Sequence, residues 1–264
     1  MKIISRENLQ ESYDYAKLYR VKLSWACAER QSRAAFDGRR KKLRDKGTGD
    51  MRDFYLDVAL CVDASGNMRD HMDRVREQMK KLPEMIRGLH VFSSHRCRMR
   101  IRLIAFTDYL TAGAQAVRLT DFYEYPEEEK ELWAELDGLT AKGGFGNRKS
   151  GLEALAYAIR SKWTAKDVNV KVIALWTNGT AREMGMSLPA YPAKMAASFE
   201  ELTRWWEAQG RDIHLILFAP AEGAWHTITE RWNNVLLYPS AAGEGLDDAT
   251  EKDMAGCIGF DYNS

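Results

Sequence analysis

Apolar and polar positions change along residues 54–238 in a pattern that predicts strands and helices in turn. The run 54–62 is almost continuously apolar, which is typical of a strand covered on both faces. Apolar residues then recur in steps of four and three over 68–86, which indicates an amphipathic helix. Pro83 is expected to kink this helix or to end its first segment.

The same alternation continues to the end of the chain. Further strands are predicted at 99–106, 115–122, 170–177, 213–219 and 235–238. Helices are predicted after Tyr125, over 152–163, through 199–206, near 224–232 and near 247–258. Strands that alternate with helices imply a three-layer, doubly wound α/β fold of Rossmann-like type, whose mostly parallel sheet carries helices on both faces. In such sheets the functional crevice lies at the carboxyl ends of the strands.

Composition and charge divide the chain into two parts. The 264 residues carry 39 basic and 38 acidic side chains, so the net charge of +1 excludes a basic field over the whole protein. Residues 1–50, however, hold 13 basic and 7 acidic side chains. We therefore expect a basic helical N-terminal arm at 1–50 and an α/β domain, including a C-terminal helix, at 51–264. The basic run 39–46 is interpreted as a solvated face or linker, or as a contact for an acidic partner or nucleic acid.

Cysteine usage and hydropathy suggest a compartment. The four cysteines are far apart and form no C-x-x-C pair, which favours free thiols in a reducing environment. No apolar run approaches the length of a membrane span, and the first residues lack the apolar stretch of a signal peptide. These features predict a cytoplasmic protein with no membrane partner.

Two loops contain residues that could carry chemistry. Asp63-Ala-Ser-Gly-Asn places a carboxylate, a hydroxyl and an amide at alternate positions, and such oxygen ligands suit Mg²⁺ or Ca²⁺. In the alternative interpretation, Asp63 and Ser65 cap the helix that follows. The loop 143–150 is one residue from a phosphate-binding P-loop, but it has Arg148 where that loop needs glycine, and it follows a helix rather than a strand.

These loops also carry a resemblance to a known family. Asp63-Ala-Ser-Gly-Asn resembles the D-x-S/T-G-S motif of von Willebrand factor type A (vWA) domains, where it forms the metal-ion-dependent adhesion site (MIDAS). The segment 143–155 resembles the G-G-G-D-x-P-E-x-x-L-x-A-L loop and helix of a bacterial, intracellular branch. The segment 172–179 resembles the strand that normally ends in T-D-A or T-D-G. The similarity covers about 51–258 and implies a vWA fold.

The departures from the family pattern bear on the metal. The resemblance assigns the MIDAS-like ligand positions to four residues: Asp63, Ser65, Asn67 and Asn178. Gly146 stands where the G-G-G-D branch has an aspartate, and the two asparagines stand where the family has a hydroxyl and a carboxylate. Since affinity for a hard dication depends on the number of charged ligands, Mg²⁺ or Mn²⁺ binding is expected to be weak or lost. Lys149 adds a positive charge, which could partly replace that of a cation if its side chain faces Asp63.

The resemblance implies a non-enzymatic protein–protein interaction or scaffold module. The expected partner-binding crevice comprises Asp108, Asn147, Arg148 and Lys149, beside the MIDAS-like positions. The alternative is a nucleic-acid or anion-binding protein that uses the basic run 39–46, with an affinity that falls steeply with salt. A scaffold should instead keep its partner when residues 1–47 are deleted. A hydrolase is disfavoured because no paired nucleophile and base stands out in the sequence.

Overall fold

A computed structural model describes residues 53–88, 96–143, 146–166, 169–210 and 212–240. The expected basic arm at 1–50, with its run 39–46, and the expected helix at 247–258 lie outside the described residues. Among the helices that are described, none is long and apolar enough to cross a membrane.

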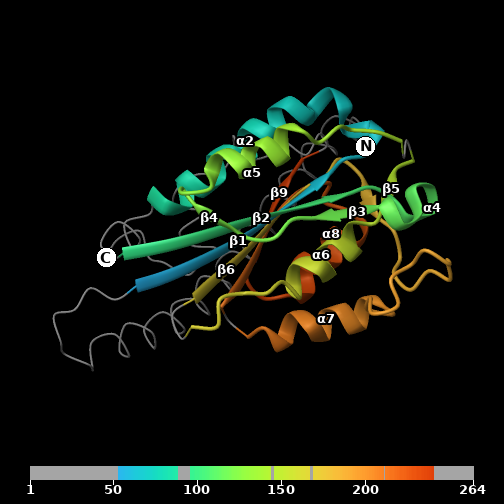
Figure 1. The fold of residues 1–264 in the computed structure, drawn as a ribbon. Helices are drawn as coiled ribbons and strands as arrows, with labels where there is room; N and C mark the ends of the chain where they lie inside the picture. Colours follow the sequence, from blue (N-terminus) through green and yellow to red (C-terminus); the bar gives the residue numbers. More distant parts are fainter. Residues whose placement is uncertain (1–52, 89–95, 144–145, 167–168, 211, 241–264) are drawn as a thin grey trace, which may run out of the picture.

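The centre of the molecule is a twisted, mostly parallel sheet. Its strands are β1 (Asp53–Asp63), β2 (Arg96–Phe106), β3 (Val117–Leu119), β4 (Tyr123–Tyr125), β6 (Asn169–Trp176), β8 (Ile213–Ala219) and β9 (Val235–Pro239). The order across the sheet is β3-β2-β1-β6-β8-β9, and β4 also pairs with β2 (Figure 1). The strands β3 and β4 run antiparallel to β2, whereas the other neighbours are parallel. The prediction of a doubly wound α/β fold is confirmed.

Helices cover both faces of this sheet. The helical segments are η1 (Gly66–His71), α2 (Met72–Gly88), α4 (Tyr109–Ala112), η2 (Gly113–Gln115), α5 (Glu129–Asp137), α6 (Gly151–Ile159), α7 (Phe199–Ala208) and α8 (Gly223–Arg231). Figure 1 shows α2 and α5 on one face, and α6 and α7 on the other. A second, two-stranded sheet joins β5 (Arg148–Lys149) to β7 (Thr180–Ala181).

Alternation along β1 explains the two layers. Leu56, Val58, Leu60 and Val62 are buried in the core formed with α2 and α5. Ala59 and Cys61 are buried in the core formed with α6, α7 and α8. Because successive strand residues point to opposite faces, Asp57 and Asp63 point to the same side as Ala59 and Cys61. Two buried carboxylates of one strand therefore lie in the layer of α6.

Three boundaries differ from the predictions. The helix α2 continues through Pro83, and the burial of Leu82, Pro83 and Ile86 offsets the hydrogen bond that proline cannot donate. Within the strand expected at 115–122, the structure has only the short β3, and the equally short β4 follows after residue 122. The helix expected to reach Trp163 ends at Ile159, whose carbonyl accepts a hydrogen bond from the Trp163 indole.

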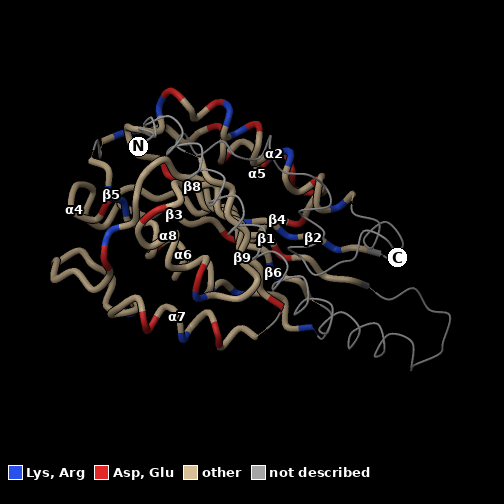
Figure 2. The backbone as a smooth tube through the Cα atoms, turned by 180° about the vertical axis from the view of Figure 1, so that it is seen from behind, with Lys and Arg blue, Asp and Glu red and all other residues tan. Residues whose placement is uncertain are grey.

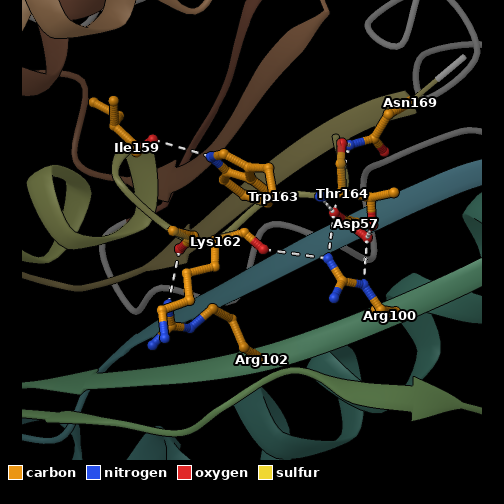
Figure 3. A network of polar contacts seen from close by, with 9 residues as sticks. Asp57, Arg100, Arg102, Ile159, Lys162, Trp163, Thr164 and Asn169 are labelled. Atoms are coloured by element: carbon orange, nitrogen blue, oxygen red, sulfur yellow. Dashed lines mark hydrogen bonds and ion pairs between the residues drawn. The ribbon is translucent and has the colours of Figure 1, made fainter. Parts of the chain in front are cut away.

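The first buried carboxylate of β1 is fully paired. Arg100 donates to both oxygens of Asp57 from Nε and Nη2, at 3.0 and 2.8 Å, as Figure 3 shows. Thr164 donates from its backbone N–H and its hydroxyl, and Asn169 donates from its side-chain amide. We call these four residues the Asp57 network. It ties β1 and β2 to the loop that leads into β6.

Candidate functional site

Three loops meet at the carboxyl ends of β1, β2 and β6. Register pairs Asp63 with Phe106, and the Ala64 backbone N–H donates to the Phe106 carbonyl at 2.7 Å. Lys142 donates from its backbone to the Ala64 carbonyl at 3.0 Å, so the loop before α6 lies against the loop after β1. The predicted crevice loops therefore do come together.

The loop before α6 also pairs with the loop after β6. The Thr180 backbone N–H donates to the Asn147 carbonyl at 2.9 Å, and β5 runs parallel to β7. A Cβ atom on Gly179 would lie 2.6 Å from the Asn147 carbonyl oxygen, so this close approach requires glycine. The two loops form one hydrogen-bonded unit.

Asp63 lies at the centre of the site and is completely buried. One carboxylate oxygen accepts the Ser65 backbone N–H at 2.9 Å, and the other accepts the Thr177 hydroxyl at 2.8 Å. Burial raises the pKa of Asp63 above its ordinary value, whereas hydrogen bonds from Ser65 and Thr177 and the charge of Lys149 act in the opposite direction. The capping alternative is not seen, since Ser65 makes no side-chain hydrogen bond as N-cap of η1.

Lys149 is the unexpected member of the site. Its side chain is 1% exposed and is among the largest fully buried side chains described. Burial lowers the pKa of Lys149, while the carboxylates of Asp63 and Asp108 favour its charged form. Burial leaves this side chain little surface to offer a partner. It places a positive charge inside the site, as expected if Lys149 faces Asp63.

Asp108 is also buried and already paired. Arg182 donates to both of its carboxylate oxygens from Nε and Nη2, at 3.1 and 2.6 Å. Asp108 also caps α4 by accepting the Leu110 backbone N–H. The residue expected in an open crevice is thus half of a buried ion pair. Sequence reasoning did not single out Arg182, although its place just after β7, opposite β5, could have suggested it.

Glu153 is another buried acid near this site, and it was not predicted from the sequence. It lies in α6 with an exposure of 0%, and the Tyr191 hydroxyl donates to one of its oxygens at 2.8 Å. Burial raises the pKa of Glu153 to about 7, and the charge of Asp108 acts in the same direction. We call Asp63, Asp108, Lys149, Glu153 and Arg182 the carboxyl-end cluster. Figure 2 shows basic and acidic positions next to one another near β5 and α4.

The accessible part of the site consists of amide and guanidinium groups. Asn67 and Asn178 are half-buried, whereas Asn147 and Arg148 are exposed. The Asn178 side-chain amide donates to the Asn67 carbonyl at 2.9 Å, and the Asn67 amide reaches the Gly146 carbonyl at 3.4 Å. The structure therefore places the four accessible residues on neighbouring loops.

The oxygen groups around Asp63 fit a divalent cation only in part. The Ser65 hydroxyl and the Asn178 amide oxygen are buried without a hydrogen-bond partner among the described residues, so two neutral oxygens are available. Asp63 supplies a carboxylate, but the positive charge of Lys149 already acts on it. Within the described ranges, no group of three His, Cys, Asp or Glu residues could hold a metal. This chemistry suits an internal pair of charges better than a hard dication.

Comparison with solved structures places the fold. The chain is similar to the pilus adhesin SpaC from Lactobacillus rhamnosus GG, with a TM-score of 0.53 and 12% identity over 81% of this chain and 32% of SpaC. It is also similar to the PilB minor pilin from Streptococcus sanguinis, with a TM-score of 0.50 and 12% identity over 82% of this chain and 63% of PilB. These likenesses show the fold alone. The chain thus spans about a third of SpaC and less than two thirds of PilB. The sequence matches no protein-family model and no curated protein.

Proposed function

We propose that the protein is a non-enzymatic interaction module of vWA type. It binds a protein partner through the loops at the carboxyl ends of the parallel strands, and its metal site is weakened or lost. We also propose that the protein is cytoplasmic and that its partner is a cytoplasmic protein.

One observation supports the proposal: the reactive groups of the site are buried, whereas its exposed groups are suited to binding. The groups with the chemistry to act on a substrate, Asp63 and the Thr177 hydroxyl, are completely buried. The exposed groups, Asn147 and Arg148, are hydrogen-bond donors and acceptors. Such groups suit recognition of a protein surface, where arginine is a frequent anchor. The adhesin and pilin folds are compatible with an interaction role.

The test is quantitative capture of partners from the native host. We expect Arg148→Glu combined with Asn147→Ala to lose a dominant partner that the wild-type chain captures, because these are the two exposed side chains among the four accessible residues of the site. The matched control is Lys130→Glu, since Lys130 is equally exposed but lies in α5 on the other face of the sheet. An unchanged partner in the edge variant would contradict the proposal. Loss of the partner only on deletion of residues 1–47 would support the basic arm instead.

A further inference from the structure

A cavity of about 540 Å³ lies on the same side of the sheet as α6, away from the carboxyl-end loops. Arg100 and Arg102 of β2 form its floor, and Tyr157 and Arg160 enter from the end of α6. Trp205 of α7 also lines the cavity, as do Pro192, Lys194 and Met195. The volume falls within the range of roughly 300–1,000 Å³ that is usual for small-molecule sites.

The lining is strongly basic. Asp121 is the one acid among the lining residues. Five lining side chains are cationic, namely Arg100, Arg102, Arg160, Lys162 and Lys194. Arg100 is neutralised by Asp57, at 2.8 Å. The other four cations form no ion pair with a carboxylate in the part of the chain that the structure describes. The cavity therefore holds more positive than negative charge.

Arg102 is the most informative of these cations because it is held in place by neutral groups. Its Nη1 donates to the Ser161 hydroxyl at 3.0 Å, and its Nη2 donates to the Thr120 carbonyl at 2.6 Å. Its Nε is buried and has no hydrogen-bond partner among the described residues. Burial lowers the pKa of Arg102, and the nearby charge of Asp121 acts in the opposite direction without forming an ion pair with it among the described residues. A bound anion would offset the cost of this burial.

Aromatic rings line the cavity beside these charges. The guanidinium groups of Arg100 and Arg102 lie 4.6 and 5.5 Å from the centre of the Phe122 ring. Arg160 lies 4.8 Å from the centre of a Trp205 ring, and its Nη1 donates to the Lys194 carbonyl. Both rings are half-buried, so each contributes apolar surface to the cavity. The side chains are therefore ordered by one another before any ligand binds.

We propose that this cavity binds a small organic phosphate with a planar ring, the chemistry of a mononucleotide. Arg102, Arg160 and the two lysines hold the phosphate, because these four cations line one cavity and form no ion pair with a carboxylate among the described residues. A phosphate dianion matches several cations in one cavity better than a single carboxylate does. The rings of Phe122 and Trp205 contact the planar part. This site is separate from the loops of the proposed interaction module.

The experiment is calorimetric titration of the full chain at low salt with AMP, adenosine and inorganic phosphate. We expect AMP to bind at one site and more tightly than adenosine or inorganic phosphate. Its affinity should fall as salt is added. The variant Lys162→Gln combined with Lys194→Gln removes two exposed charges of the cavity. It should fold normally and bind AMP at least about tenfold more weakly, since each lost contact to phosphate is charge-assisted.

The matched control is Lys81→Gln combined with Lys130→Gln. It removes the same charge from exposed positions on α2 and α5, on the other face of the sheet, and should leave AMP affinity unchanged. Arg102→Gln should abolish binding, and if that variant fails to fold, the lysine pair still decides. The proposal is overturned if AMP does not bind at millimolar concentration, if adenosine or phosphate binds as tightly as AMP, or if both double variants weaken AMP equally.

Discussion

Two buried aspartates of one strand, Asp57 and Asp63, are satisfied in different ways. Asp57 meets a guanidinium directly and accepts further hydrogen bonds from Thr164 and Asn169. Asp63 is hydrogen-bonded by the neutral groups of Ser65 and Thr177, and its positive counterpart is a lysine from another loop. The Asp57 network is thus complete in itself. The carboxyl-end cluster has charge that is only partly compensated, and such clusters are more frequent at functional sites than in structural ion pairs.

The largest effect expected from this difference is on the Asp57 network. Asp57→Ala leaves Arg100 and three further donor groups of Thr164 and Asn169 without their acceptor, so we expect it to lower the free energy of unfolding by about 3–5 kcal/mol. Asp63→Ala should cost less, because the donors it abandons are neutral. Urea denaturation of both variants measures the difference. Asp137→Ala is the control, because its pair with Lys80 is solvent-exposed and worth less than about 1 kcal/mol. Equal losses for Asp57→Ala and Asp63→Ala would remove the distinction.

The next effect is a pH dependence that belongs to the carboxyl-end cluster. The pKa of Glu153 is about 7 in the folded protein, above its ordinary value of 4.5. The folded state therefore binds this proton more tightly than the unfolded state, and the contribution of Glu153 to stability falls as pH rises from about 4.5 through 7. Above pH 7 the free energy of unfolding should be lower than at pH 4.5 by roughly 3 kcal/mol on account of Glu153. Denaturation at several pH values should show a flatter profile for Glu153→Gln than for the wild type. An identical slope in both proteins would show that Glu153 titrates normally.

A smaller effect is expected from the buried lysine. Lys149→Met removes the cation beside Asp63 and Asp108, and we expect a loss of about 1–3 kcal/mol. The loss is limited because Asp63 can take up a proton and Asp108 keeps Arg182. In a double-mutant cycle, Lys149→Met with Asp63→Asn should cost less than the sum of the single changes, by at least about 0.5 kcal/mol. Simple additivity would mean that the two charges do not interact.

The smallest expected effect is that of divalent cations. If the site bound a cation present at 100 times its dissociation constant, the free energy of unfolding would rise by about 2.7 kcal/mol. Each kcal/mol would raise the Tm by about 2–4 °C. We expect millimolar Mg²⁺ or Mn²⁺ to leave the Tm of the wild type unchanged. Asp63→Ala serves as the reference without the carboxylate. A rise of several degrees in the wild type that is absent from Asp63→Ala would restore the metal to the site.

The fold could be predicted from local sequence patterns, whereas the burial and ion pairing of the site residues could not. Continuous apolar runs and the three-and-four spacing of 68–86 are local signals, so they placed β1 and α2 well. The meeting of Asp63 with the loops at Asn147 and Asn178 could also be predicted, because parallel strands end at a common edge. The burial of Lys149 could not, since a lysine in a polar loop is usually exposed and its position depends on the pairing of β5 with β7. The ion pair of Asp108 with Arg182 depends on the same pairing.

The pairing of β5 with β7 also bears on how this protein can change over time. Each strand has two residues, and the close approach of Gly179 to Asn147 leaves no room for a larger side chain. A substitution on one loop therefore alters the backbone on which the other loop depends. Sequence drift at this edge should proceed by compensating pairs, one change at 147–149 and one at 179–182. Libraries that vary both segments together should contain folded variants in which a change at one segment is tolerated only with a change at the other.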